Sequence, residues 1–450
     1  MKDGVSKMLR RSVIVSLVLV AALVSGCASV MKASCSAPEV TSWAAPSVFV
    51  LKFPFALDPS LRGVVAAESI DPLLDLQSVA IASNLVQTNL TLLTSSPGEP
   101  CDVARAYDAV TAKKSGLLGR RLYRSAIFVW GDIVQRGGVL YTQTSMRVFW
   151  NDRDGTVTMR YAMPGIDQPL RFVGRFPGTT ITFPPQPISD ATLAKLTTQA
   201  DRLKPRAAPN IAAPTVELPQ HFTIAGSSHG WILLVPKEGA EAWLSIEAIA
   251  DTSIELVPEM EFVRAVAAYL QFTASGSERS ARISEESLRL FTKSAPTGSA
   301  AQSLPLAIGD VIRGTLKQAA RGDGVAAFPG AACLLTGGAT PDDALNASSA
   351  VDFESAISRN TRDSDILTLS ALGKIAGLCR GTHESARSEI EGITQSLQAA
   401  RRYDVASPEA VLNLANWYRL LSRVDTALTR ATGEEMTDRA NALERAMQVP

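Results

Sequence analysis

The chain has 450 residues, of which 46% are apolar and 20% charged, with 44 basic side chains against 44 acidic ones. This apolar fraction excludes a wholly disordered protein, and a net charge of zero argues against a protein that coats nucleic acid. Only one apolar run, near the N-terminus, approaches the length of a membrane span, so a polytopic membrane protein is excluded. The length allows roughly two to four domains.

The N-terminus has the pattern of an export signal. Residues 2–11 carry four basic side chains, and residues 13–24 form an apolar stretch that is too short to span a bilayer. The stretch ends in Val-Ser-Gly-Cys, which resembles the lipobox of bacterial lipoproteins. That resemblance implies that residues 1–26 are a signal peptide and that Cys27 is lipidated, becoming the first mature residue. The alternative is an ordinary secretory signal with an incidental cysteine.

The residue after the cysteine bears on the membrane. Ala28 stands where an aspartate favours retention at the inner membrane, so the resemblance implies anchoring at the outer membrane, facing the periplasm. Several acyl chains such as palmitate would hold the protein firmly, at about 0.8 kcal/mol per buried methylene. The leader carries four basic residues and one acidic residue, so its removal leaves the mature chain at −3. A mildly acidic mature protein has still less reason to bind nucleic acid.

Four further cysteines lie in an oxidising compartment if the chain is exported: Cys35, Cys101, Cys333 and Cys379. Cys333 and Cys379 both sit in helical apolar patterns, so a bridge between two helices is one hypothesis, with Cys35 to Cys101 as its complement. The alternative is four unpaired thiols that behave as small apolar groups. No CxxC spacing indicates a redox motif or a cysteine-based zinc site.

A small polar tether at residues 27–45 leads into a predicted mixed α/β domain at residues 46–204. Strands, helices and then a meander follow one another, which predicts an α+β fold. The expected elements are a strand at 48–53, a helix with an apolar face from Leu73 to Leu90, a second helix after Asp102, a hairpin turning at 136–138, a return strand at 157–161, and short strands near 170–173 and 179–183.

This order resembles the α/β domain shared by the curli-secretion lipoprotein and the TolB amino-terminal domain. The matching residues are the opening apolar strand, Val48 to Phe53, and the strand that runs from Ser125 through Trp130 and Gly131 to Ile133. The resemblance covers about a third of the chain and carries no catalytic signature. It implies an envelope protein that binds partners.

Prolines and alanines at residues 205–219 predict a stiff, extended linker before a small β module at residues 220–256. The pairs Gly-Trp at Trp231 and Ala-Trp at Trp243 resemble bacterial Src-homology-type small barrels, which often bind cell wall or peptide. The two tryptophans are therefore candidate binding residues. The competing interpretation is that both fill the core of the module.

Residues 257–450 read as helices throughout, and Ser407-Pro408-Glu409 is a strong helix start. Residues 349–357 resemble the second helix of a tetratricopeptide repeat, with Ser349, Phe353 and Ala356 at its small, aromatic and small positions. A regular repeat is not visible in the sequence. A solenoid with a concave peptide-binding surface and an ordinary helical bundle therefore both stay open.

Motifs for chemistry are scarce. The three histidines, at positions 221, 229 and 383, form no HExxH or other metal-ligand pair, and P-loop, GxGxxG and SxxK motifs are missing. Residues 226–230 fit GxSxG with Ser228 as the nucleophile, but a strand follows it where an esterase needs a helix, so a hairpin turn is favoured. Asp152 and Asp154 are interpreted as turn residues. Acidic residues at 434, 435 and 438 are interpreted as a solvated helix face.

The sequence therefore predicts a lipid-anchored, periplasm-facing protein that docks envelope protein partners in a secretion or surface-assembly complex, without catalysis, metal or cofactor. The alternative is a lipoprotein that binds peptidoglycan or another glycan through Trp231 and Trp243. A serine esterase that uses Ser228 is the third and least favoured hypothesis.

Overall fold

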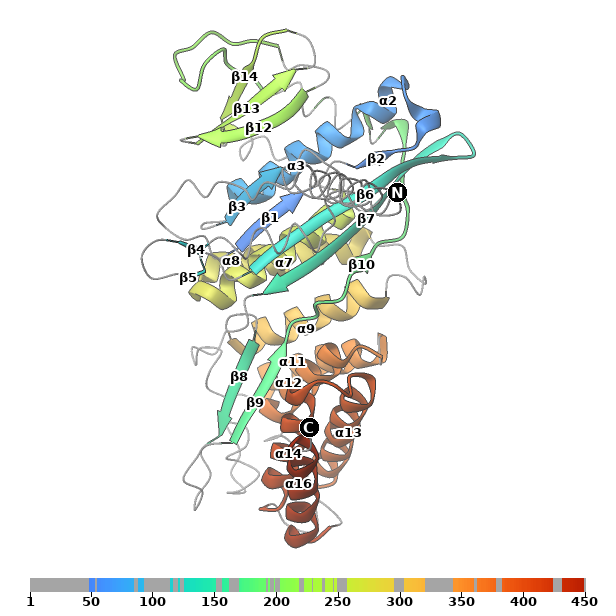
Figure 1. Cartoon of the computed structure of the whole chain (residues 1–450), viewed down its shortest axis with the longest axis vertical. Helices are drawn as coiled ribbons and strands as arrows, with labels where there is room; N and C mark the ends of the chain where they lie inside the picture. The colour runs from blue at the N-terminus through green and yellow to red at the C-terminus, as the bar shows by residue number, and fades with distance from the viewer. Residues whose placement is uncertain are drawn as a thin grey trace, which may run out of the picture.

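We describe a computed structural model of the chain. It describes residues 48–52, 55–84, 88–92, 114–115, 120–121, 125–150, 156–161, 170–191, 193–194, 198, 203–217, 222–228, 230–236, 239–245, 247–248, 257–294, 303–319, 343–359, 362–377, 383–423 and 431–448. Helix and sheet are both present, so the predicted α+β class is confirmed. The β module and the last helices lie at opposite ends of the long axis, with the main sheet between them (Figure 1).

The main sheet is built around β1 (Val48–Lys52), which runs parallel to β3 (Thr88–Leu92) on one side and to β6 (Ser125–Arg136) on the other. β6 continues into the antiparallel β7 (Val139–Trp150). Three short strands complete the sheet: β2 (Ala56–Leu57) beside β6, and β10 (Ile181–Thr182) and β11 (Gln186–Ile188) beside β7.

The predicted hairpin turn is confirmed. Gly137 and Gly138 have φ values of +57° and +82°, the left-handed pair that a two-residue type I′ turn requires. The predicted opening strand is confirmed as β1. The long helix is wrong at its end: α3 stops at Asn84, and Leu90 lies in β3. The alternation Thr-Asn-Leu-Thr-Leu favours a strand there.

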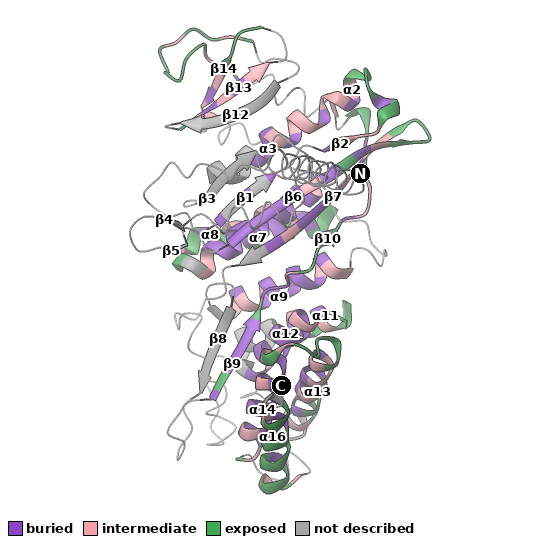
Figure 2. Cartoon of the chain, in the orientation of Figure 1, coloured by how far each residue is buried: buried purple, intermediate pink, exposed green. Residues whose placement is uncertain are grey.

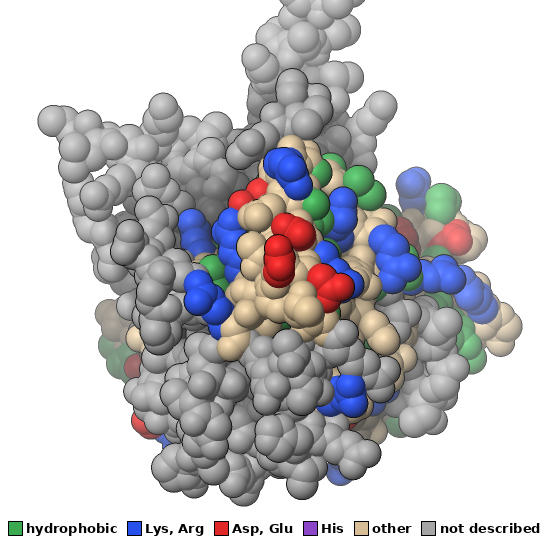
Figure 3. Space-filling model, turned by 90° about the horizontal axis from the view of Figure 1, so that it is seen from below, with side chains coloured by type: hydrophobic (Ala, Val, Ile, Leu, Met, Phe, Trp, Pro, Cys, Tyr) green, Lys and Arg blue, Asp and Glu red, His purple; other side chains and the backbone are tan. Residues whose placement is uncertain are grey.

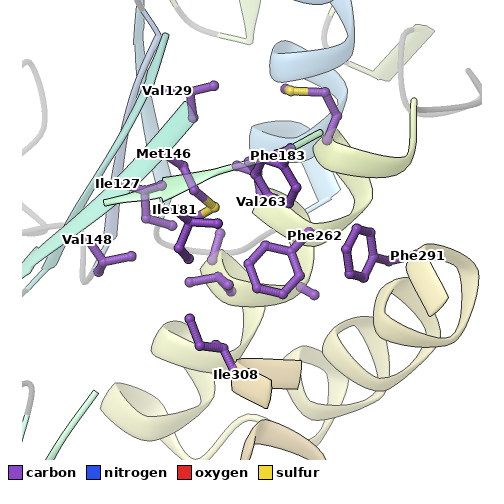
Figure 4. Packing of buried hydrophobic residues seen from close by; sticks show 14 of the residues in the cluster. Ile127, Val129, Met146, Val148, Ile181, Phe183, Phe262, Val263, Phe291 and Ile308 are labelled. Atoms are coloured by element: carbon purple, nitrogen blue, oxygen red, sulfur yellow. The ribbon is translucent and has the colours of Figure 1, made fainter. Parts of the chain in front are cut away.

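One face of this sheet carries the larger core (Figure 4). Ile127 and Val129 of β6 and Met146 and Val148 of β7 share that face by register. They meet α7 (Pro258–Ser275), including Phe262, in one cluster that also takes in α8 (Glu278–Ser294) and α9 (Ser303–Ala319). The aromatic rings of Phe262 and Phe291 lie 5.0 Å apart. The core therefore crosses the boundary that we predicted at residue 257.

The remaining helices pack as successive hairpins. Each helix contacts the next along the chain, with close pairs α7–α8, α9–α11, α12–α13 and α14–α16. The later members are α11 (Asp343–Arg359), α12 (Ser364–Gly377), α13 (His383–Tyr403), α14 (Pro408–Leu421) and α16 (Gly433–Gln448). The predicted helix start is confirmed, because the Ser407 hydroxyl accepts from the Ala410 N–H at the head of α14.

Phe353, which the sequence placed in a repeat-like helix, is a buried knob between two helices. A methyl carbon on Gly314 of α9 would lie 2.7 Å from its ring, and one on Gly373 of α12 would lie 2.3 Å away. Interiors are packed too densely to absorb such an overlap. The two glycines therefore make the hole into which this ring fits.

We expect Gly373→Ala to destabilise the protein by about 2 kcal/mol, because the Phe353 ring or a whole helix must move to admit the methyl group. Gly392→Ala is the matched control: it is also inside a helix, but its nearest neighbour is Lys374 Nζ at 3.9 Å. The control should be more stable than the wild type by up to about 1 kcal/mol, because alanine has the higher helix propensity. Urea unfolding of both variants measures the difference, and equal stabilities would contradict this packing.

A second, two-stranded sheet stands apart from the main one. β8 (Thr156–Tyr161) and β9 (Leu170–Arg175) form an antiparallel ribbon that pairs with no other described strand. Leu170 and Phe172 belong to the second core cluster, formed with α12, α13, α14 and α16. We predicted the two strands within the α/β domain, yet the ribbon packs on the helices (Figure 1).

The proline-rich segment folds back on itself and does not run as an extended spacer. Ala207 N–H donates to Pro214 O at 3.0 Å, and Arg206 forms bridges with both Thr215 and Trp243. Arg206 also donates from Nη1 to the Ala213 carbonyl at 2.8 Å. These bonds close a loop over residues 206–215, because its backbone groups find partners within the loop and on the neighbouring strand.

Candidate functional site

The β module consists of β12 (Phe222–Ser228), β13 (Trp231–Pro236) and β14 (Ala242–Ser245) in antiparallel order. Trp231 pairs with Ser245, and Leu233 pairs with Trp243. Because side chains alternate along a strand, both tryptophans lie on the same face, as diagonal neighbours on adjacent strands. The structure thus brings the two candidate binding residues together.

Buried and partly buried residues alternate along β13 and β14 (Figure 2). Ile232, Leu234 and Leu244, which point the other way, are almost completely buried. Trp231 and Trp243 are only half-buried. Both tryptophans therefore lie on the less buried face of the two strands, and the competing prediction that they fill the core stays a prediction. A pair of half-buried indole rings on one face can stack on sugar rings or on a peptide.

The neighbouring segment fixes the edge of this face. Trp243 N–H donates to Arg206 O at 2.7 Å, and Arg206 N–H donates to Trp243 O at 2.6 Å. The two bonds add the proline-rich loop to β14 as a further strand position. This pairing covers the backbone of the edge strand beside Trp243 and leaves its ring half-buried.

The GxSxG sequence is a hairpin, as the sequence predicted. Ser228 ends β12 directly opposite Trp231, and Gly230 takes the turn with a φ of +82°. A nucleophile elbow needs a helix after the serine, and here β13 follows. His221 and His229 lie outside the described residues, and the side chain of His383 is also outside them.

Several predicted sites lie outside the described residues: the lipidation site Cys27, the candidate disulfide cysteines 35, 101, 333 and 379, and the turn residues 152 and 154. Within the described ranges, no group of three or more His, Cys, Asp or Glu side chains could hold a metal ion. In the same ranges, no helix has both the length and the apolar character needed to cross a membrane.

The acidic residues near the C-terminus are exposed, as predicted for a solvated face. Glu435 accepts from the Thr432 N–H at 2.7 Å, and Thr432 Oγ1 accepts from the Glu435 N–H at 3.1 Å. This reciprocal pair is a capping box at the start of α16. The Thr432 N–H and hydroxyl both donate to the Glu435 carboxylate, and these two bonds hold the pKa of Glu435 below its ordinary value.

A buried ion cluster at the end of β1 escaped the sequence analysis. Lys52 Nζ lies 2.5 Å from Asp71 Oδ1 and 2.6 Å from Asp75 Oδ1, and its side chain has no exposed surface. The ammonium also lies 5.0 Å from the centre of the Phe55 ring, and Phe55 N–H donates to Asp71 at 3.0 Å. The sequence does carry a signal for this cluster: a lysine within an apolar strand, followed by two aspartates one helical turn apart.

Burial opposes the charge on Lys52, but the carboxylates of Asp75 and Asp71 outweigh it, so the pKa of Lys52 stands above its ordinary value. Burial raises the pKa of Asp75 to about 6, against the pull of the lysine. With Lys52 closed off from solvent, this cluster joins α3 to the sheet and does not present a surface to a ligand.

Glu259 is the second buried acid that the sequence analysis missed. It lies in the first turn of α7 with 1% of its surface exposed, and its Oε1 accepts from Thr142 Oγ1 and Thr144 Oγ1, both at 3.1 Å. Oε2 has no hydrogen-bond partner among the residues that the structure describes. Burial raises the pKa of Glu259, and the two threonine bonds only partly offset this. Burial at this site therefore favours the neutral acid more than water does.

We expect the wild-type protein to lose stability relative to Glu259→Gln as the pH rises. The folded pKa lies above the unfolded value, so the contribution of the carboxyl is fully present below about pH 4.3 and is lost as the pH rises through the folded pKa. Each unit between the two pKa values corresponds to about 1.4 kcal/mol. Urea midpoints from pH 4.5 to 8 measure the effect, with the exposed Glu285→Gln as control. Parallel profiles for wild type and Glu259→Gln would refute it.

The ribbon and the helices are joined by two asparagines on α14, which the sequence analysis passed over. Asn413 Oδ1 accepts from Val173 N–H at 2.7 Å, and its Nδ2 donates to Val173 O at 2.6 Å. Asn416 Nδ2 donates to Arg171 O, also at 2.6 Å. Two asparagines three apart on the apolar face of a helix are the sequence signal, because a buried amide requires a polar partner.

Comparison with known proteins gives no relative for this chain: no family model, no curated protein and no solved structure matches it.

Proposed function

We propose that the chain is a lipid-anchored envelope protein, held at the outer membrane through Cys27 and facing the periplasm, which docks protein partners without catalysing a reaction. The support from the sequence is the lipobox-like segment and the order of the predicted modules. From these features we expect the protein to bind partners in a secretion or surface-assembly complex.

The single observation that carries the docking proposal is the array of helical hairpins from α7 to α16, fixed to the main sheet at one end and to the ribbon along its side. Stacked helical hairpins typically present extended binding surfaces, and their stability comes from contacts between neighbours. In the view from below, the described surface carries acidic and basic side chains interspersed (Figure 3). A surface of mixed sign favours specific protein contacts over attraction to a polyanion.

Cross-linking in intact cells, followed by affinity purification of the full-length protein, tests this function. We expect the same envelope proteins to be recovered in repeated preparations. Recovery of the monomer alone would refute docking. The anchor is tested separately: Cys27→Ser should release the protein from sedimenting membranes, and continued sedimentation together with an unlipidated mature wild type would refute lipidation.

A second candidate function is binding of peptidoglycan or another glycan by the β module. The observation that favours it is the half-buried state of Trp231 and Trp243 on one face. Sedimentation with purified peptidoglycan tests it. Trp231→Ala and Trp243→Ala should each weaken binding, whereas Tyr403→Ala, which removes an exposed ring from the C-terminal end of α13, should not. Unchanged binding in both tryptophan variants would exclude this site.

A further inference from the structure

The loop at residues 206–215 exposes an uncharged, apolar tip. Residues 207–216 carry no charged side chain, and the turn at residues 210–213 places Ile211 at the tip with 75% of its surface exposed. Most of the alanines and prolines around it are exposed as well (Figure 2). A contiguous apolar surface of this kind marks a contact with another molecule or with a membrane, because apolar groups are unfavourable in water.

The backbone groups of this loop bond largely within the loop. In the turn, the Ala213 N–H donates to Asn210 O and the Ala212 N–H donates to Asn210 Oδ1, both at 3.0 Å. At the base, the Ala207 N–H donates to Pro214 O at 3.0 Å, and the two prolines of the loop have no N–H to satisfy. A segment that enters lipid must satisfy its backbone internally, whereas a segment that pairs with a protein strand keeps these groups free for its partner. The loop therefore suits lipid better than a protein edge.

The two tryptophans of the β module lie close to this loop. Arg206 and Trp243 exchange both of their backbone bonds, so their side chains point to the same face. From that face the Arg206 guanidinium reaches Ala213 O at 2.8 Å, which keeps the loop near Trp243 and, beyond it, Trp231. Half-buried indole rings are typical of the boundary between lipid and water. Lys204, which is exposed at the base of the loop, is the kind of residue that lies among headgroups there.

The other strongly exposed apolar side chains of the described residues stand beside charges. Val405, with 77% of its surface exposed, follows Asp404, and Val351, with 64% exposed, precedes Asp352. A neighbouring charge opposes transfer out of water, because a charged group is costly to bury without a partner. The lack of charge over residues 207–216 therefore distinguishes the loop from these sites.

The proposed anchor leaves the loop free to meet a membrane. Cys27 and Val48 are 21 positions apart, a length of chain that reaches at most about 75 Å when extended. Val48 opens β1, whose neighbour β3 contacts β12 of the β module. The module and its loop lie at one end of the long axis, so a flat bilayer can approach them (Figure 1).

We propose that the tip of this loop, centred on Ile211, inserts into the interface of a phospholipid bilayer as a second, reversible membrane contact. A single small loop binds lipid weakly, and the proposed anchor makes it effective by holding it at high local concentration beside the surface. Loss of the anchor at Cys27 therefore still releases the protein from washed membranes. This inference goes beyond partner docking and adds a surface of contact to the proposed anchor.

The depth of the tip is measured on vesicles of phosphatidylethanolamine and phosphatidylglycerol that contain a nickel-chelating lipid. The full mature chain is held on them by an N-terminal histidine tag, so the test does not require Cys27 to be lipidated. Ile211→Trp adds a fluorophore at the tip, and Val405→Trp adds one at a similarly exposed control site. When the acyl chains are brominated, the fluorescence added at position 211 should lose most of its intensity, while that added at position 405 should not. Equal quenching at the two positions would overturn the proposal.

The strength of the contact is measured with the untagged, unlipidated mature chain at increasing concentrations of the same lipids. Ile211→Asn should lower the partition coefficient about tenfold, because a polar amide replaces an apolar side chain that leaves water. Val405→Asn should leave the coefficient unchanged, and equal weakening by both variants would contradict an insertion at the tip. Partitioning should persist at high salt, since the loop is uncharged. A loss of binding on adding salt would assign it to surface charge and overturn the proposal.

Failure of this inference is distinguishable from failure of the proposed function. If Ile211→Asn removes an envelope partner that cross-linking recovers with the wild type, and position 211 escapes quenching, the loop binds protein. The docking function then stands and the lipid contact falls. If no partner is recovered while quenching at position 211 persists, docking falls and the lipid contact stands.

Discussion

Replacing Lys52 by methionine should destabilise the protein by about 3 kcal/mol at neutral pH, because it leaves two carboxylates of α3 facing each other without their cation. This is the lower end of the cost of breaking a buried ion pair. The aspartates keep 23% and 16% of their side-chain surface exposed, so water replaces part of what the ammonium supplied. Urea unfolding of the two proteins gives the difference.

The cost should shrink in acid. Burial already holds the pKa of Asp75 at about 6 in the wild type, and removing Lys52 takes away the charge that lowers it. In the variant the pKa of this carboxyl therefore rises further, so it takes up a proton at a higher pH than in the wild type, which relieves the repulsion. The destabilisation should fall from pH 8 to pH 4.5.

The surface variant Lys293→Met is the control, because this lysine is exposed on α8. Its effect should stay within about 0.5 kcal/mol at every pH. A cost for Lys52→Met that is the same at pH 4.5 and pH 8 would contradict the role of Asp75. A more stable variant would show that the cluster does not hold α3 to the sheet.

Replacing Asn413 by alanine should cost about 3 kcal/mol, because the buried N–H and C=O of Val173 then lose their partners. Each unsatisfied buried group costs about 1–3 kcal/mol. Hydrogen exchange gives a second readout: the Val173 amide should lose its protection, while amides in β6 keep theirs.

Graded variants separate the two bonds. Asn413→Asp keeps an acceptor for the Val173 N–H but loses the donor to its carbonyl, so its cost should be distinct from that of alanine. Asn416→Ala loses one bond, to Arg171 O, and should cost less. Asn441→Ala on α16 is exposed and should be nearly neutral. If Asn413→Ala costs no more stability than Asn441→Ala, the Asn413 side chain does not stabilise the backbone of β9 at Val173.

Local patterns predicted much of the fold. The glycine pair at 137–138 and the apolar strand from Val48 each have one physical interpretation, and the structure has both. The helix ending at Asn84 was extended too far, since Leu90 fits an apolar face with period 3.6 as well as a strand with period 2. The spacing of apolar residues alone could not show where the helix ends and β3, which pairs with β1, begins.

What the sequence could not predict is how segments far apart meet. Nothing local in residues 170–175 indicates that their backbone bonds with α14 and not with the main sheet. Lys52 and Glu259 look like ordinary charged residues until the fold buries them. The two tryptophans were predicted as candidates from a resemblance to small barrels, but whether they fill a core or face outward depends on register and on what covers each face.

The hydrogen bonds from Asn413 and Asn416 of α14 to β9 also have a consequence for how the molecule is made. Val173 and Asn413 are 240 residues apart, so a chain that emerges from its N-terminus completes β9 long before the residues that close its edge exist. Bringing such distant segments together is slow, because the chain loses loop-closure entropy before the contact contributes any stabilising free energy. During that interval the backbone edge of β9 that later faces α14 is open to other chains. Correct maturation therefore depends on protecting one short strand until the last quarter of the protein arrives.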